Sequence, residues 1–277
     1  MDAPRSAITS PQNARIKLVQ SLRDRRARDQ TGLMRVEGYD EISLALASGL
    51  DLSMLFYCPA LFRSPDQAGL LDTIGGTGTE LIEVRRDLFE RISYREGPDG
   101  WLAVCRSPVR GLDSLWLDAC PFILVAEGIE KPGNLGAMLR TADAAGVTCA
   151  IAADPLADWG NPNVVRASKG AVFSVPVAQA GTPEAIAWLR SHGILIVVAD
   201  PHAARPYTQE RYVDPVAIVV GSENHGLSPA WTDAADAQVG IPMFGRVDSL
   251  NVATAAALLL YEALNQRLAA GRPQVGR

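Results

Sequence analysis

Residues 241–255 read IPMFGRVDSLNVATA and join a proline- and glycine-containing loop to a long alanine-rich segment. Ser249 is a natural N-cap, which would place Asn251 in the first turn of a final helix. Helical spacing then predicts a buried face made of Val252, Ala255, Ala256, Leu259 and Leu260. The small residues near this face would let another element approach closely. Taken alone, the pattern also fits an amphipathic helix with an ordinary cap.

Four strongly apolar runs precede this helix and indicate strands at residues 122–128, 148–153, 194–200 and 215–221. Such runs are typical of parallel strands that helices cover on both faces. Helical segments are expected between them, at 134–146, 163–170 and 184–193. The fold class is therefore α/β, with a parallel-sheet domain over residues 120–277.

Shorter strand-like and helical runs alternate upstream and predict a small α/β sandwich over residues 1–106. A helix over about residues 11–29, capped by Ser10, is expected to open it. Strands are expected at 33–36, 53–58, 80–84 and 100–105, with helices at 40–49, 66–76 and 85–93. Residues 107–119 interrupt the alternation with Pro108 and Gly111, so they are assigned as a linker.

The composition, with 48% apolar and 21% charged residues in 277, is typical of a soluble globular protein. No apolar run is long enough to span a bilayer, and the N-terminus lacks the apolar core of a secretory signal. The four cysteines have no C-x-x-C spacing, which favours buried free thiols over disulfides or metal ligands. The three histidines are scattered. We therefore expect a cytoplasmic protein that uses no membrane and no metal.

Positive charge is concentrated near the N-terminus, although the net charge of the chain is −5. Residues 5–35 hold eight Lys or Arg against two Asp, so this segment carries +6 and the remainder −11. Because acids at i,i+4 do not compensate the excess, it predicts a phosphate-binding surface; a solvated helix face is the alternative. Arg5 belongs to this segment, and the binding candidates are Arg15, Lys17, Arg23, Arg25, Arg26, Arg28 and Arg35.

Two polar segments follow predicted strands, where ligands of α/β proteins bind. Residues 127–146 fit neither G-x-G-x-x-G nor a Walker motif, but they place Asn134 at the predicted N-cap of a helix and Arg140 about two turns into it. Such a pair could clamp ribose and phosphate, or be ordinary capping beside a surface arginine. In residues 219–227, VVGSENHGL, Gly221 ends a strand and Glu223 follows at a cleft rim; a polar turn is the alternative.

In this order, the three segments resemble the signature motifs of SpoU/TrmH-type RNA ribose 2′-O-methyltransferases. The first motif is Asn134-x-Gly with Arg140, and the second is Gly221-x-Glu223-x-x-Gly226. The third is Ile241-Pro242-Met243 followed by Ser249-Leu250-Asn251-Val252. The resemblance covers about residues 120–270, with Ala253 where many relatives have serine. More weakly, Asn13, the basic helix and Val36-Glu37-Gly38 resemble the RNA-binding domain of many members.

The resemblance implies a trefoil knot in the C-terminal domain and S-adenosylmethionine as cofactor. Its implied cofactor-binding residues are Ala199, Gly221, Ile241, Met243, Leu250 and Asn251. Backbone groups and the apolar side chains among them would suit a neutral adenine. The implied catalytic residues are Asn134, Arg140, Glu223, Ser249 and Asn251. A guanidinium is a poor base at neutral pH, so we expect Arg140 to clamp phosphate and ribose, and Glu223 to be better suited to accept a proton.

The resemblance also implies an RNA substrate and a twofold homodimer. A separate N-terminal domain favours rRNA, most of all 23S rRNA, over tRNA. An antibiotic-resistance methyltransferase acting on 23S rRNA, of the kind that protects against avilamycin, is a narrower alternative. A non-catalytic RNA-binding protein that retains the fold is the rival class. The apolar surface of the final helix supports dimerisation, although burial within its own domain would explain the same pattern.

Overall fold

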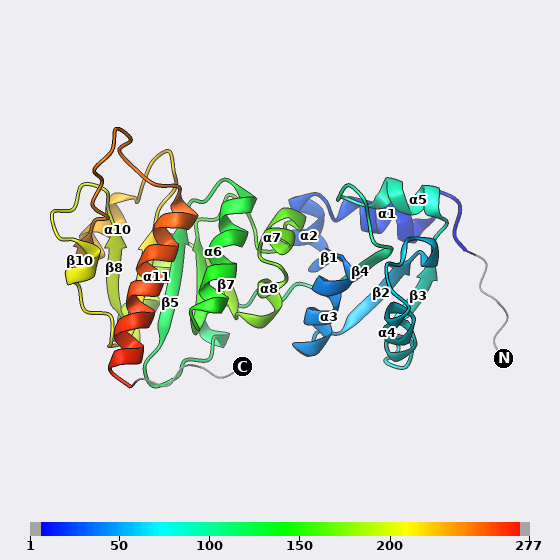
Figure 1. The fold of residues 1–277 in the computed structure, drawn as a ribbon, viewed down its shortest axis with the longest axis horizontal. Coiled ribbons are helices and arrows are strands. Elements are labelled where there is room, and N and C mark those ends of the chain that lie inside the picture. Colours follow the sequence, from blue (N-terminus) through cyan, green and yellow to red (C-terminus); the bar gives the residue numbers. More distant parts are fainter. Residues whose placement is uncertain (1–6, 272–277) are drawn as a thin grey trace. The chain divides into compact units, whose positions relative to one another are not determined.

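The computed structural model describes residues 7–271, which form two compact units (Figure 1). One unit comprises residues 7–108 and 160–173, and the other comprises residues 109–159 and 174–271. Residues 160–173 thus pack with the first unit, although the sequence pattern assigns them to the C-terminal domain. The predicted boundaries, 1–106, 107–119 and 120–277, stay a prediction.

The first unit has a mixed four-stranded sheet in the order β1-β4-β2-β3. Its strands are β1 (Leu33–Glu37), β2 (Leu52–Tyr57), β3 (Glu80–Glu83) and β4 (Trp101–Arg106). Strand β4 is antiparallel to β1 and β2, whereas β2 and β3 are parallel. The helices are α1 (Ala14–Ser21), α2 (Arg25–Thr31), α3 (Tyr39–Ala47), η1 (Pro59–Leu61), α4 (Asp66–Gly75), α5 (Arg86–Ile92), α7 (Pro162–Ala167) and α8 (Ala171–Ser174). The expected α/β character and all four strands are confirmed.

The single helix expected over residues 11–29 is wrong, because it is divided into α1 and α2 at residues 22–24. Asn13, not Ser10, caps α1: its side chain accepts a hydrogen bond from the Arg15 N–H at 2.9 Å. The Arg28 guanidinium, on α2, donates to the carbonyls of Leu22 and Arg23 at 3.0 and 2.7 Å. These are carbonyls that the end of α1 leaves without helical partners, so Arg28 stabilises the break.

The second unit is built on a six-stranded sheet in the order β10-β8-β9-β5-β6-β7, and every pairing is parallel. Its strands are β5 (Phe122–Glu127), β6 (Cys149–Ala153), β7 (Val177–Ala180), β8 (Leu195–Ala199), β9 (Val216–Val220) and β10 (Ala237–Val239). The four strands predicted from sequence are confirmed. Strands β7 and β10 were missed, since VAQA and AQV are too short to show an apolar run.

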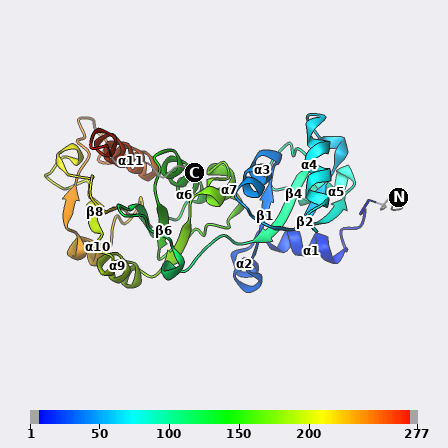
Figure 2. The same ribbon diagram turned by 90° about the horizontal axis from the view of Figure 1, so that it is seen from below.

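Helices cover both faces of this sheet, as the apolar strands predicted (Figure 2). On one face, α6 (Pro132–Ala144) and α11 (Val252–Ala269) pack against each other, and α11 packs on β9. On the other face lie α9 (Thr182–Ser191) and α10 (Pro229–Ala234), whose Trp188 and Trp231 belong to one apolar cluster with residues of the sheet. Two short helices, η2 (Leu112–Ser114) and η3 (Tyr207–Gln209), complete the unit. Among residues 7–271 we find no helix with the length and apolar character of a membrane span.

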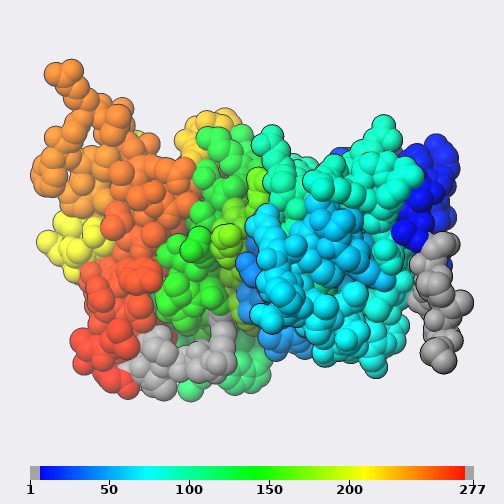
Figure 3. Space-filling view, turned by 45° about the vertical axis from the view of Figure 1, so that its right-hand side comes forward, coloured from blue at the N-terminus to red at the C-terminus, as the bar shows by residue number. Residues whose placement is uncertain are grey.

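The chain after β10 returns past the loop that follows β8. The Gly240 N–H donates to the Arg205 carbonyl and the Tyr207 N–H donates to the Gly240 carbonyl, both at 2.9 Å. A Cβ at Gly240 would lie 2.7 Å from the carbonyl oxygen of Ala203, so only glycine fits this approach. The trefoil knot stays a prediction, and this is the region where we expect it. Residues 244–249, which are all exposed and orange in Figure 3, then stand out from the unit before α11 begins.

Candidate active site

Asn134, Glu223 and Asn251 meet at one point of the second unit, although up to 117 residues separate them in sequence. The Nδ2 atoms of both asparagines donate to Glu223 Oε1, at 2.6 Å from Asn134 and 2.7 Å from Asn251. Asn251 Nδ2 also lies 3.2 Å from Asn134 Oδ1. One carboxylate oxygen therefore fixes the orientation of two amide side chains.

Parallel topology explains this convergence. Strands β5 and β9 are neighbours, so the loops that leave their carboxyl ends meet at one edge of the sheet. Asn134 is the third residue of α6, after β5, so its predicted N-cap position is wrong and Lys131 is the N-cap. Glu223 lies in the turn after β9. That turn is closed by paired hydrogen bonds between Ser222 and Gly226, at 3.1 and 2.9 Å. A Cβ at Gly221 would lie 2.3 Å from the Gly226 backbone, so the glycine serves the turn itself.

Asn251 reaches the cluster from the start of α11. It is the N-cap of this helix, because its Oδ1 accepts from the Ala253 N–H at 3.0 Å. The predicted cap, Ser249, lies two residues earlier and is exposed. The cap assignment from sequence is therefore wrong, since an asparagine already fills the capping position. Its Oδ1 is used by the helix, which leaves Nδ2 to bind Glu223.

Lys131 also belongs to this cluster, and the sequence analysis missed it. Its Nζ lies 2.5 Å from Glu223 Oε2. This hydrogen bond lowers the pKa of Glu223 below its ordinary value, against the opposing effect of partial burial, and the Asn134 bond contributes in the same direction. The same pair raises the pKa of Lys131. Glu223 is thus ionised at neutral pH and is a weaker base than an ordinary glutamate.

Arg140 and Ser249, the other predicted catalytic residues, make no side-chain hydrogen bond or ion pair within residues 7–271, and both are exposed. Arg140 is six residues after Asn134 on α6, which places it about 120° around the helix axis from Asn134. The structure therefore brings together three of the five predicted residues. It leaves the Arg140 side chain available to another molecule.

A cavity of about 530 Å³ opens between the loop after β8 and the segment after β10. Ile241 and Met243, two of the predicted cofactor residues, line it; Ala199, Gly221, Leu250 and Asn251 do not. The other lining residues are Pro201, His202, Ala203, Ala204, Pro206, Gly240, Pro242, Gly245, Val247 and Asp248. Its volume and its mainly apolar side chains with two polar ones fit a nucleoside-sized ligand such as S-adenosylmethionine. In the described part of the chain, no group of three or more His, Cys, Asp or Glu is placed to hold a metal.

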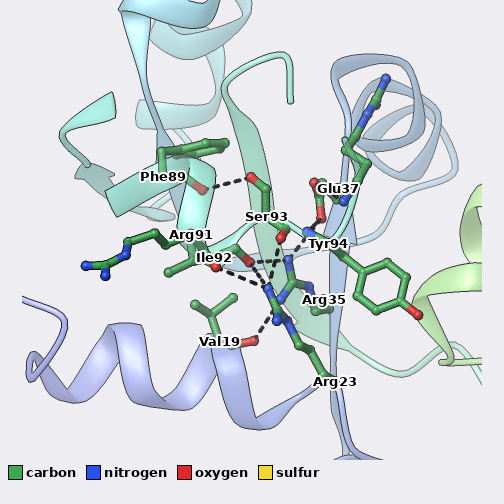
Figure 4. A network of polar contacts seen from close by, with 10 residues as sticks. Val19, Arg23, Arg35, Glu37, Phe89, Arg91, Ile92, Ser93 and Tyr94 are labelled. Carbon is green, nitrogen blue, oxygen red and sulfur yellow. Dashed lines mark hydrogen bonds and ion pairs between the residues drawn. The ribbon is translucent and has the colours of Figure 1, made fainter. Parts of the chain in front are cut away.

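The first unit uses three of the seven predicted RNA-binding residues for its own structure. Two of them, Arg23 and Arg35, are drawn in Figure 4. Arg35 is only 1% exposed, and its guanidinium bonds to Glu37 at 3.0 Å and to the carbonyls of Ile92 and Val19. Arg23 donates to the Ile92 carbonyl as well, at 2.9 Å. Arg28 is buried and stabilises the break between α1 and α2. Assigning a phosphate contact to the buried Arg28 and Arg35 was wrong, because the sequence pattern does not report burial.

The remaining four candidates are exposed. Arg15 bonds to Glu80 at 2.5 Å and Arg25 pairs with Asp29 at 3.5 Å, so the excess charge is partly compensated, contrary to the prediction. Lys17 and Arg26 make no ion pair within residues 7–271. Arg5 lies outside the described residues. The surface available to a polyanion is therefore smaller than the charge count of the segment indicated.

Replacing Arg35 by methionine is expected to destabilise the protein by about 3 kcal/mol, because removing one partner of a buried ion pair leaves the other without compensation. A urea titration of the full chain measures this loss. Arg26→Met is the matched control, since Arg26 is exposed and makes no ion pair within residues 7–271. Equal stability of the two variants would mean that the Arg35 network contributes nothing to folding.

Comparison with known proteins assigns both parts of the chain. Residues 121–261 match the SpoU rRNA Methylase family, and residues 13–103 match the MRM3-like substrate binding domain. The chain belongs to the SpoU rRNA methylase family. It is 29% identical to the 23S rRNA (guanosine(2553)-2′-O)-methyltransferase RlmP of Bacillus subtilis, over 92% of this chain and 97% of that protein.

Two further relatives come from Streptomyces viridochromogenes. The chain is 34% identical to its 23S rRNA (uridine(2479)-2′-O)-methyltransferase, over 94% of this chain and 92% of that one. It also resembles the crystal structure of the SpoU methyltransferase AviRb in complex with the cofactor AdoMet, with a TM-score of 0.86 and 32% identity over 96% of this chain and 100% of that one. The names of the Bacillus subtilis and Streptomyces viridochromogenes methyltransferases specify a guanosine and a uridine, so membership of the family leaves the target base open.

Proposed function

We propose that this protein transfers a methyl group from S-adenosylmethionine to a ribose 2′-hydroxyl of 23S rRNA in the cytoplasm. The observation that carries the proposal is the cluster of Asn134, Glu223 and Asn251 at the carboxyl edge of the parallel sheet. Its three members come from the three motifs of the family. Similarity over nearly the whole length to two 23S rRNA 2′-O-methyltransferases favours rRNA over tRNA as substrate.

The cofactor, when bound, supplies an electrophilic methyl group on a sulfonium. Ile241, Met243 and Val247 would cover its apolar parts in the 530 Å³ cavity and exclude water. Asn134 and Asn251 would orient the ribose hydroxyl, since Glu223 already holds both amides. Because its pKa is lowered, we assign Glu223 chiefly to this orientation rather than to removal of the hydroxyl proton. Arg140 would clamp a substrate phosphate.

The proposal is tested by two measurements on the full chain. Calorimetry should give one S-adenosylmethionine bound per chain, without added metal. Incubation with radiolabelled cofactor and transcribed 23S rRNA should then transfer label to one ribose. Cofactor binding without any transfer to rRNA or tRNA would favour the non-catalytic RNA-binding protein.

We also propose that two chains associate through α11. Leu258, Tyr261 and Leu268 are 37, 45 and 55% exposed, and their spacing places them along one side of this helix. Burial within its own unit therefore does not account for the whole apolar surface of α11. The neighbouring helix α6 carries Arg140, exposed and without a partner within residues 7–271. Helix pairing across a twofold axis would cover the apolar side chains.

A dimer at micromolar concentration is the expected result of sedimentation. The double variant Tyr261→Glu/Leu268→Glu should sediment as a monomer. In a dimer, the two new carboxylates of one α11 would be buried against the same carboxylates of the other chain. Leu195→Glu, on an apolar side chain that is 39% exposed at the start of β8, is the control and should leave the dimer intact. A wild-type monomer would end the dimer proposal.

The first unit would contact RNA through Lys17 and Arg26, two exposed cations with no ion pair in the described part of the chain. Reversing both to Glu should weaken rRNA binding and reduce its salt dependence, since each lost phosphate contact lowers the salt slope by about 0.7–0.9. S-adenosylmethionine affinity should not change. Lys17→Gln/Arg26→Gln removes charge without reversing it and should give a smaller effect. Unaltered binding in both variants would make this surface a solvated helix face.

A further inference from the structure

The segment between β10 and α11 has two sides with different surroundings. Met243, Gly245 and Val247 line the 530 Å³ cavity. Phe244 and Arg246 alternate with them and do not line it. Phe244 is 98% exposed, so its ring packs against almost nothing in its own chain. In Figure 3 the segment, in orange, stands clear of the surface around it.

An aromatic ring in this position differs from the scattered apolar side chains that every surface carries. It lies directly beside a cavity wall, on a segment whose residues 244–249 are all exposed. Arg246, two residues away, is exposed and makes no hydrogen bond or ion pair within residues 7–271. A ring and a free cation next to each other are suited to a ligand with both a flat face and a negative charge.

We propose that Phe244 stacks on a base of the substrate RNA, at or next to the nucleotide that is methylated, and that Arg246 binds a neighbouring phosphate. The inference rests on the proposed function, because methyl transfer requires the acceptor ribose to reach the cavity. A nucleotide seated there has its base and its flanking phosphates beside this segment. An unstacked nucleotide in a loop offers its base to an aromatic side chain without requiring one particular base.

A second copy of this chain is the competing partner for Phe244. The exposed apolar residues of α11 already provide a surface for self-association. Two copies meeting at this segment would also bring two unpaired Arg246 cations together, whereas an RNA phosphate would neutralise one. The segment also carries Asp248, which lines the cavity, so its formal charges balance. The cation next to the ring is Arg246, and it favours RNA as the partner of Phe244.

The test compares full-length wild type, Phe244→Ala and Phe244→Trp, with transcribed 23S rRNA as probe. Phe244→Ala should raise the rRNA Kd and KM about tenfold. This corresponds to about 1.4 kcal/mol, which is within the range of the free energy of stacking one base on one aromatic side chain. Phe244→Trp should restore both. Arg246→Met should lower the slope of log K against log salt by about 1. Cofactor affinity and sedimentation should stay as in wild type. Leu195→Ala is the control, at the opposite, amino end of β8.

Unchanged rRNA binding by Phe244→Ala would overturn the inference and leave the proposed function standing. Loss of the dimer in this variant would assign the ring to a second copy, and loss of cofactor affinity would assign it to the cavity; both results would overturn it. Because rRNA binding is measured at equilibrium without turnover, the result stays separate from the proposed function. That function fails if wild type transfers no methyl group.

Discussion

Replacing Glu223 by glutamine is expected to reduce methyl transfer by about 10²–10³-fold while cofactor affinity stays the same. The magnitude is that of losing one oriented polar group in an active site. Glutamine keeps the shape of the side chain but loses the charge that holds Lys131 and two asparagine amides. Single-turnover kinetics with labelled cofactor measure the rate, and calorimetry measures cofactor binding. Wild-type turnover in Glu223→Gln would show that the cluster does not organise the reaction.

A control for this variant lies on the neighbouring loop. Glu130 is exposed and accepts a hydrogen bond from Asn224 at 3.2 Å, and within residues 7–271 no hydrogen bond joins it to Asn134 or Asn251. Glu130→Gln should therefore retain the wild-type rate. Lys131→Met tests the lowered pKa: without its ammonium, the pKa of Glu223 should move back toward its ordinary value, which a carboxyl titration by NMR can follow.

The pH dependence follows from the same pKa. A carboxyl whose folded pKa is lowered stabilises the native state above its unfolded pKa, and this stabilisation is lost as the pH falls through the folded value. Glu223 therefore contributes no change of activity or stability across the neutral range. Any limb of the pH–rate profile near neutrality belongs to another group.

The second large effect is expected for Gly240→Ala, which should lower S-adenosylmethionine affinity about 5–150-fold. The new Cβ would lie 2.7 Å from the carbonyl oxygen of Ala203, so the loop after β8 must move away from the segment after β10. These two parts of the chain form the two walls of the cavity. Overpacking of this kind costs about 1–3 kcal/mol. Calorimetry gives the affinity, and a thermal melt checks that the variant is folded.

Gly111→Ala is the matched control, because Gly111 lies in the same unit, does not line the cavity, and a Cβ there has no neighbour within 4 Å. It should bind the cofactor as wild type does. If Gly240→Ala also binds normally, the cofactor lies elsewhere. The turn after β9 would then be the next place to examine, since Gly221 is held against the backbone of Gly226.

The sequence predicted those parts of the fold that long apolar runs encode. Strands β5, β6, β8 and β9 are buried on both faces, so almost every residue in them is apolar. Strand β10 has only three residues and an exposed glutamine, and its pairing with β8 depends on tertiary contacts. The break between α1 and α2 depends on Arg28, whose burial no helical pattern reveals.

The sequence predicted the part of the candidate site that consists of motif residues at the carboxyl edge of the parallel sheet. Asn134, Glu223 and Asn251 were named from the motifs, and parallel strands bring them together. Lys131 was not, because an exposed lysine before a helix has no pattern of its own; its place beside Pro132-Gly133-Asn134 was the available signal. Charge counting likewise could not separate buried Arg35 from exposed Arg26.

Mapping of 2′-O-methylated riboses in 23S rRNA, from cells with and without this protein, tests the central claim most directly. We predict one ribose that is methylated only when the wild-type protein is present. The same ribose should stay unmethylated when Glu223→Gln replaces the wild type. Identical ribose methylation with and without the protein, or a protein-dependent methyl group on a base, would contradict the assignment of ribose 2′-O-methyl transfer to 23S rRNA.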